Sequence, residues 1–213
     1  MIEVDPSSTS RAESFSLFAS APMPMLTAFK TIDITKVVKI SKRRKIKLNA
    51  ILCYAVYLAA KDIEEMHYLV REGKLYFSDK MSIGVVVRGS NGMLINCEIP
   101  ATENFSIFYN DYNKTIEKAV LENKFESKEK RVSVGTSAIL TGNIDGMINL
   151  YSPIYTNPFL IWSRYENKLF KKKLKVSFQF HHAQLDGREA VFFLENFQKN
   201  LFKIDNFCVK TCK

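Results

Sequence analysis

Two adjacent histidines open the run HHAQLDG at residues 181–187, at the end of a strand-like segment. The preceding segment, 173–180, alternates apolar and polar side chains, which predicts a β-strand with one buried face. By this alternation we expect His182 on the apolar face and His181 on the polar face. A neutral imidazole in a dry site beside a hydroxyl is a suitable general base near pH 7. His182 is therefore the candidate for the chemistry.

A purely structural interpretation of the same run also exists. Asp186 could be the N-cap of a following helix, with Glu189 completing a capping box and Gly187 relaxing the turn. That helix is predicted from apolar residues at helical spacing, namely Ala190, Phe193, Leu194, Phe197 and Leu201. An isolated histidine here would more often be structural, whereas a histidine pair with aspartate and glycine at this spacing favours catalysis. Capping and catalytic roles are compatible for Asp186.

Length and composition predict one folded domain spanning residues 1–213. The chain has 213 residues, of which 46% are hydrophobic and 12% aromatic, and this content argues against disorder. Its start lacks a signal-peptide pattern, and no apolar run is long enough for a membrane span, so we expect no membrane partner. The four cysteines lack zinc-finger spacing, and no metal site is expected. A reduced protein of the cytoplasm is the simplest interpretation.

The net charge of +9 is concentrated in two basic runs, at 42–47 and 171–173. By ordinary surface statistics, the interpretation that both runs are solvated turns carries about half of the weight. A phosphate-bearing cofactor is the main alternative. Nucleic acid is not the expected partner, because neither run is interleaved with the aromatic residues that stack on bases.

Periodicity predicts a mixture of helices and strands. Helices are expected near 35–41, from 48 to 59, near 105–122 and after Asp186, and strands near 75–78, 81–88, 93–99, 157–165 and 173–181. A polar loop is expected at 123–132, and isolated His67 is assigned a structural role. The irregular alternation favours an α/β fold with a mixed sheet flanked by helices. Phosphate-loop and GxSxG motifs are absent from the sequence.

The HHAQLDG run, its strand and its helix together resemble the active-site segment of the chloramphenicol acetyltransferase family. The similarity continues through segment 11–35, which ends in IDIT, the buried helix that follows Lys47, the turn at 67–79 and the strand at 157–165. Dihydrolipoamide acyltransferases and peptide-synthetase condensation domains share the histidine motif. The length of the chain and its N-terminal stretch favour the chloramphenicol acetyltransferase branch.

The resemblance implies a two-layer α/β sandwich that assembles as a homotrimer with active sites at subunit interfaces. It implies acetyl-CoA as co-substrate, with no permanently bound cofactor, and a small hydroxylated molecule as acceptor. His182 would be the general base, Asp186 would pair with Arg11, and Lys47 and Arg164 would lie near coenzyme A. Acceptor contacts are expected from Leu17, Phe18, Leu26 and Asn143.

Three positions depart from the family pattern. Phe18 replaces a tyrosine, Ile161 replaces a threonine near the coenzyme, and Asp145 and Gly146 stand where a serine that stabilises the oxyanion is expected. If that position is vacant, Gly146→Ser should raise turnover. Two alternatives therefore stay open: an acyltransferase with another acceptor or acyl donor, and a trimeric binding protein without efficient chemistry.

Overall fold

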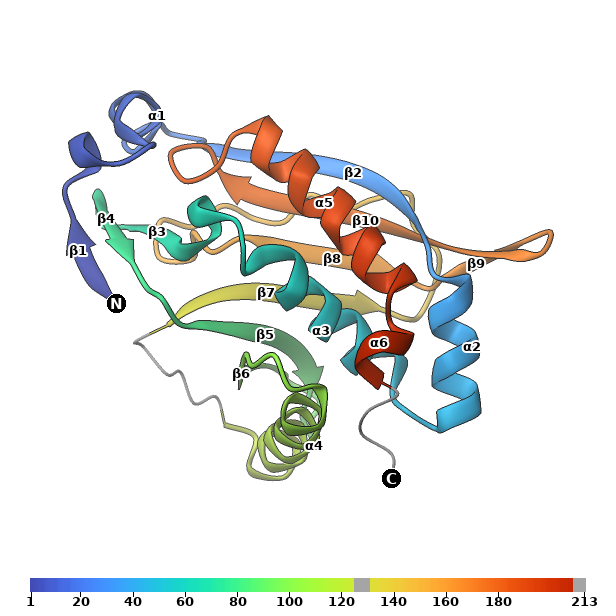
Figure 1. Ribbon diagram of the computed structural model, residues 1–213. Helices are drawn as coiled ribbons and strands as arrows, with labels where there is room; N and C mark the ends of the chain where they lie inside the picture. Colours follow the sequence, from blue (N-terminus) through green and yellow to red (C-terminus); the bar gives the residue numbers. More distant parts are fainter. Residues whose placement is uncertain (125–130, 209–213) are drawn as a thin grey trace.

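A mixed seven-stranded β-sheet forms the centre of the computed structural model, which describes residues 1–124 and 131–208 (Figure 1). Its strand order is β2-β10-β8-β7-β5-β6, with β9 paired to the start of β10. The β5–β7 and β7–β8 pairs are parallel and the others antiparallel. The strands are β2 (Met25–Asp33), β5 (Met81–Arg88), β6 (Leu94–Pro100), β7 (Val132–Ile139), β8 (Phe159–Ser163), β9 (Glu166–Lys168) and β10 (Lys171–His181).

A second, three-stranded sheet lies beside the N-terminus and contains β1 (Ile2–Val4), β4 (Lys74–Phe77) and β3 (Tyr68–Arg71). The predicted turn between β3 and β4 is confirmed, with Glu72 and Gly73 both in the left-handed region. His67 is structural, as predicted: its two ring nitrogens lie 2.8 and 2.9 Å from the carbonyl oxygens of Ser78 and Lys61.

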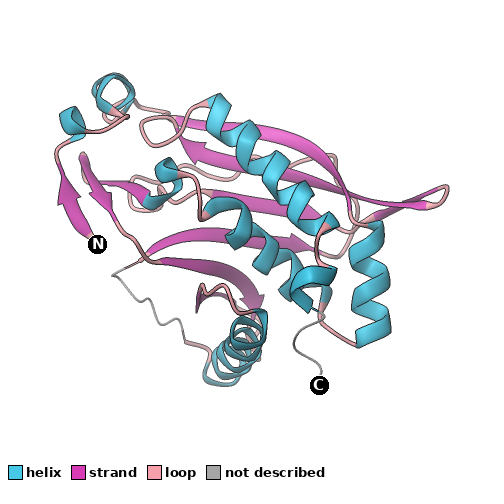
Figure 2. Ribbon diagram, viewed as in Figure 1, coloured by secondary structure: helices cyan, strands magenta, loops and turns pink. Residues whose placement is uncertain are grey.

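The helices lie on one face of the large sheet, which makes the fold the predicted two-layer α/β sandwich (Figure 2). Helices α3 and α5 pack against each other and against the sheet. Helix α2 lies beside the N-terminal end of β10, and α4 packs on β6. Their bounds are α1 (Ala12–Phe18), α2 (Thr35–Arg44), α3 (Leu48–Ala60), α4 (Phe105–Glu122), α5 (Gly187–Phe202) and α6 (Asp205–Cys208), with short 3-10 helices η1 (Pro6–Ser8) and η2 (Glu64–His67). Within the described residues, no helix packs on the opposite face of the sheet.

The alternation along β10 explains how the core holds this strand. Leu174, Val176, Phe178 and Phe180 are buried toward the helices, and the Phe178 ring lies 4.4 Å from that of Phe193 in α5. Helix α3 is apolar on nearly all sides and is buried along most of its length, as its composition predicts. This packing holds β10 firmly against the helix layer.

Several sequence expectations need adjustment. The strand at 81–88 and the helix at 105–122 are confirmed, whereas α2 extends to Arg44, beyond the expected end. Strand β2 was not expected, and β7 begins inside the predicted polar loop; residues 125–130 of that loop lie outside the described part. Cys53 and Cys97 are buried free thiols. Cys212 lies outside the described residues. None of the described helices combines the length and apolar character needed to cross a bilayer.

Candidate active site

The tight turn after β10 positions the histidine pair. Strand β10 pairs with β2 up to His181, opposite Met25. The backbone N–H of His182 then donates to the Pro24 carbonyl at 2.8 Å, and the N–H groups of Gln184 and Leu185 donate to the His181 carbonyl. The chain therefore leaves the sheet at His182 and enters α5 within five residues.

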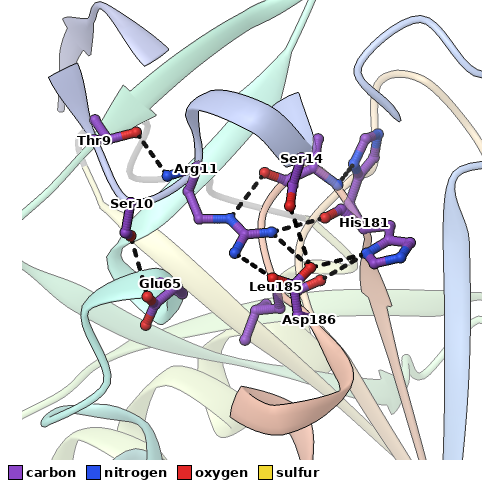
Figure 3. Close-up of polar contacts among 10 residues, drawn as sticks. Thr9, Ser10, Arg11, Ser14, Glu65, His181, Leu185 and Asp186 are labelled. Atoms are coloured by element: carbon purple, nitrogen blue, oxygen red, sulfur yellow. Dashed lines mark hydrogen bonds and ion pairs between the residues drawn. The ribbon is translucent and has the colours of Figure 1, made fainter. Parts of the chain in front are cut away.

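Arg11 lies next to this turn although it comes from the other end of the sequence (Figure 3). Its side chain is only 3% exposed, and its guanidinium binds both carboxylate oxygens of Asp186, at 2.8 and 2.9 Å. It also donates to the carbonyls of Ala183 and His182. The fork geometry makes this a charge-assisted bidentate pair. The structure thus brings together two of the three residues expected to be catalytic and ties them to the backbone of the third.

Asp186 is the N-cap residue of α5 by position, but its side chain caps nothing. The predicted capping box does not form, because the carboxylate is bound by Arg11 and also lies close to His182 and Ser14. The hydrogen bonds from Arg11 hold the pKa of Asp186 below its usual value, against the opposing effect of burial. Asp186 is therefore a carboxylate at neutral pH.

The ring of His182 is held from two sides. Its Nδ1 lies 3.1 Å from Asp186 Oδ1 and 3.3 Å from the Leu185 carbonyl oxygen. The Phe18 ring stacks on the imidazole at 4.0 Å, almost parallel to it. Both neighbours of Nδ1 are acceptors, so in the neutral ring Nδ1 carries the hydrogen and Nε2 keeps the lone pair. The His182 side chain is 27% exposed, so its ring is fixed in orientation and remains accessible.

The alternation argument holds for His181, which continues the face of Ser177 and Gln179, but it does not place His182. Strand β10 ends at His181, so alternation does not extend to His182, and it is His181 that is buried, at 1% exposure. The Nδ1 of His181 accepts a hydrogen bond from the Ala183 N–H at 3.1 Å. Burial, with a smaller contribution from His182, lowers the pKa of His181 to about 4. His181 is thus a neutral residue that holds the turn.

Protonation of His181 predicts a loss of stability in acid. The unfolded chain binds this proton near pH 6.5, whereas the folded chain binds it near pH 4. Between these values the unfolded state holds more protons, so stability falls as pH falls, by up to about 3 kcal/mol. In His181→Asn the amide oxygen can still accept the Ala183 N–H but does not titrate. Urea unfolding at pH 7 and 4.5 should show a smaller decrease for this variant, and an equal decrease in both proteins would refute the assignment.

The remaining expected site residues divide into two groups. Phe18 contacts His182 directly, and Leu17 and Leu26 are exposed on neighbouring elements, α1 and β2. Lys47 directly precedes α3 and Arg164 directly follows β8. The start of α3 and the end of β8 lie at the end of the sheet opposite the C-terminal end of β10 (Figure 1). Exposed Asn143 also lies toward that end, since the neighbouring Ile144 carbonyl accepts a hydrogen bond from Ser163 at the end of β8. Within one chain these three do not reach His182.

The loop expected to hold the oxyanion group is also distant from His182 of the same chain. The Met147 N–H donates to Ser177, four residues before His181, which is roughly 13 Å along a strand. Asp145 instead forms an ion pair with Lys175. A Cβ at Gly146 would lie 2.3 Å from the Phe29 ring, so a serine there would displace that ring. Gly146→Ser is therefore not the simple restoration that the sequence suggested.

Sequence reasoning did not identify two residues that support the site. Ser14 lies one helical turn after Arg11, and its hydroxyl is 3.4 Å from Asp186. Gln184, inside the histidine motif, is fully buried and donates to the carbonyls of Tyr68 and Glu65. A polar residue at a buried turn was the available signal for Gln184.

Comparison with known proteins agrees with this geometry. A family model described as chloramphenicol acetyltransferase matches residues 1–198. A chloramphenicol acetyltransferase from Staphylococcus aureus is 25% identical over 184 residues, covering 84% of this chain and 86% of the relative. A solved chloramphenicol acetyltransferase superposes with a TM-score of 0.79 at 18% identity, covering 93% of this chain and 98% of that one. The dihydrolipoamide acetyltransferase of Azotobacter vinelandii gives 0.70 at 16% identity, covering 92% and 88%.

Proposed function

Because the chain belongs to the chloramphenicol acetyltransferase family, we propose that this acyltransferase moves an acetyl group from acetyl-CoA to a hydroxyl of a small molecule, with His182 as general base. The observation that carries the proposal is the environment of the His182 ring. The Asp186 carboxylate and the Leu185 carbonyl oxygen both lie near Nδ1 and can only accept a hydrogen bond from it, so Nε2 is the nitrogen with a free lone pair.

The proposed reaction is a single acyl transfer. Nε2 of His182 takes the proton of the acceptor hydroxyl while its oxygen attacks the thioester carbonyl of acetyl-CoA. The carbon–sulfur bond breaks, the thiolate takes up a proton, and an acetyl ester and free coenzyme A result. The carboxylate of Asp186, kept ionised by Arg11, stabilises the imidazolium that forms on His182.

Coenzyme A needs contacts along its whole length, and we assign Lys47 and Arg164 to its phosphate-bearing part. Both residues lie at the end of the sheet opposite His182, near basic α2. A long pantetheine arm is the kind of ligand that can join such separated positions. Acetyl-CoA is a co-substrate in this scheme, and no cofactor is permanently bound. The cytoplasm, which supplies acetyl-CoA, is the proposed compartment.

The helix-free face of the sheet supports the proposed homotrimer. The loop after β7 crosses this face, where Gln179 and Ser177 bind its backbone. Together with β2, this loop exposes several large apolar side chains: Phe29, Ile148, Leu150, Ile154 and Tyr155. Several exposed large apolar side chains on one face mark a protein interface more often than a free surface. We infer that neighbouring copies cover part of this face and complete the active sites.

Light scattering tests the assembly. The expected molar mass is near three times the 24.5 kDa of the chain. A monomer at assay concentration that is still fully active would contradict the shared-site proposal, because each chain would then contain a complete site.

A thiol-release assay tests the reaction. Acetyl-CoA is incubated with the protein, with and without chloramphenicol, and free coenzyme A is titrated. Release that depends on chloramphenicol supports both the activity and that acceptor, and it would make antibiotic resistance the physiological role. An absence of release with every hydroxylated acceptor offered would contradict the proposal.

A further inference from the structure

The hairpin that joins β9 to β10 extends beyond α2 and away from the rest of the chain (Figure 1). Lys168 is paired with Lys171, so the turn between the two strands consists of Leu169 and Phe170. These two residues are 99% and 95% exposed, the highest values among the large apolar residues that the structure describes. Neither side chain contributes to the core, and the tip of this projection is therefore apolar.

Leu169 also occupies an unfavourable backbone position. Its φ is 51°, in the left-handed region, where hairpin turns favour glycine, asparagine or aspartate. The β-carbon makes this conformation costly for leucine, and an exposed side chain gives no burial in return. The stability of the folded chain therefore does not explain a leucine here, which indicates a contact outside the chain.

Positive charge surrounds the apolar tip. Segment 166–173 has four lysines and one glutamate, a net charge of +3. Lys168 and Lys171 flank the turn directly, and both are exposed. The start of α2 lies next to the hairpin, since the Lys172 N–H donates to the Thr35 hydroxyl at 2.8 Å. Further exposed cations follow along α2 and at its C-cap: Lys39, Lys42, Arg43 and Lys45.

An anionic lipid surface fits this combination better than a protein partner does. A stable protein interface buries about 800 Å² on each partner, which a projecting tip of two residues cannot supply. A bilayer can surround such a tip, because apolar side chains enter between the headgroups while lysines stay at the level of the phosphates. Each lysine near an anionic surface also strengthens the attraction. The shape, polarity and charge of the hairpin thus all favour lipid.

We propose that the β9–β10 hairpin docks this protein on an anionic lipid surface, with Leu169 and Phe170 inserted between the headgroups and the flanking lysines beside the lipid phosphates. The sequence argument against a membrane partner concerned a spanning segment, which a peripheral contact does not need. The apolar side chains assigned above to the subunit interface belong to β2 and the loop after β7, not to this hairpin. The 11 residues of β10 separate the tip from His182, so docking leaves the proposed base free.

Co-sedimentation with vesicles tests the proposal. One set of vesicles contains phosphatidylcholine alone, and the other contains phosphatidylcholine and phosphatidylglycerol in equal parts. The wild-type protein should bind the anionic vesicles at least about ten-fold more tightly than the neutral ones, because several lysines contribute. Added salt should weaken this binding, and Lys171→Gln should weaken it by about five-fold.

Two substitutions at the tip separate docking from folding. Leu169→Asn and Phe170→Ser should each weaken binding to the anionic vesicles by about ten-fold or more, the effect expected for one large apolar side chain. Leu169→Asn should leave the free energy of unfolding unchanged or raise it, because asparagine suits the left-handed turn. Leu121→Gln is the matched control: it removes an exposed leucine from α4 and should bind vesicles like the wild type.

Phe170→Trp reports insertion directly. The chain has one tryptophan, Trp162, which is 2% exposed, so its emission should not respond to vesicles. The added indole keeps a large aromatic side chain that suits the headgroup region, so binding should be retained. The emission of this variant should shift to shorter wavelength with the anionic vesicles.

Several outcomes would overturn the proposal. One is a wild-type protein that does not bind the anionic vesicles, including one that binds soluble polyglutamate instead, which would indicate an acidic protein partner. Another is equal vesicle binding by the wild type and both tip variants, since charge alone would then explain the attachment. A loss of folding stability in Leu169→Asn would give the leucine a structural role. None of these measurements uses acetyl-CoA or turnover, so they are independent of the proposed function.

Discussion

Replacing His182 with alanine is expected to lower the turnover of acyl transfer by about a hundred-fold to ten-thousand-fold, the usual contribution of a positioned general base. The variant removes Nε2, the nitrogen left with a lone pair by the contacts of Nδ1. It should leave folding nearly unchanged, because His182 is partly exposed and lies beyond the end of β10. Steady-state kinetics with acetyl-CoA measure the effect, and the KM for acetyl-CoA should change little.

His181→Asn is the matched control for this experiment. It alters the neighbouring histidine but keeps an acceptor for the Ala183 N–H, so most of the activity should remain. An equal loss of turnover in both folded variants would contradict the assignment of His182 as the base.

Removing the carboxylate of Asp186 is expected to give the largest loss of stability. In Asp186→Ala the guanidinium of Arg11, which is 3% exposed, would keep its charge without its bidentate partner. Loss of one partner of a buried pair typically costs about 3–5 kcal/mol, and partial exposure of Asp186 places the expectation near the lower figure. Turnover should fall as well, because Nδ1 of His182 loses one of its two neighbours. Urea unfolding curves measure the first effect, and kinetics measure the second.

An exposed ion pair provides the control. Glu3 and Lys74 form a pair in which both side chains are more than half exposed. Glu3→Gln should therefore change the free energy of unfolding by less than about 1 kcal/mol. If Asp186→Ala destabilises the protein no more than Glu3→Gln does, the Arg11–Asp186 pair is not the structural anchor of the turn.

Local patterns predicted only part of the site. His182 and Asp186 are four residues apart in one turn, so their contact follows from local geometry. Arg11 is distant in sequence, and periodicity could not pair it with Asp186; the expectation came from the family resemblance. The sequence could not show that His181 is buried and His182 partly exposed, because this depends on the turn after β10, which contacts with Pro24 and Ala183 hold.

The same limit applies to the sheet. Strand β2 was missed because exposed Leu26 and Phe29 interrupt the signal of a half-buried strand, and its pairing with β10 is a tertiary effect. Lys47, Arg164 and Asn143 were expected near ligands, but the sequence could not indicate how far from His182 they would lie.

The stoichiometry of the products tests the central claim most directly. Free coenzyme A and acetylated acceptor are quantified in the same reaction, the first by thiol titration and the second by mass spectrometry. The proposed mechanism predicts one acetyl ester for each thiol released by the wild-type protein, and almost none of either product from His182→Ala. Thiol release without an acetylated acceptor, or a wild-type rate retained by His182→Ala, would contradict acyl transfer by this base.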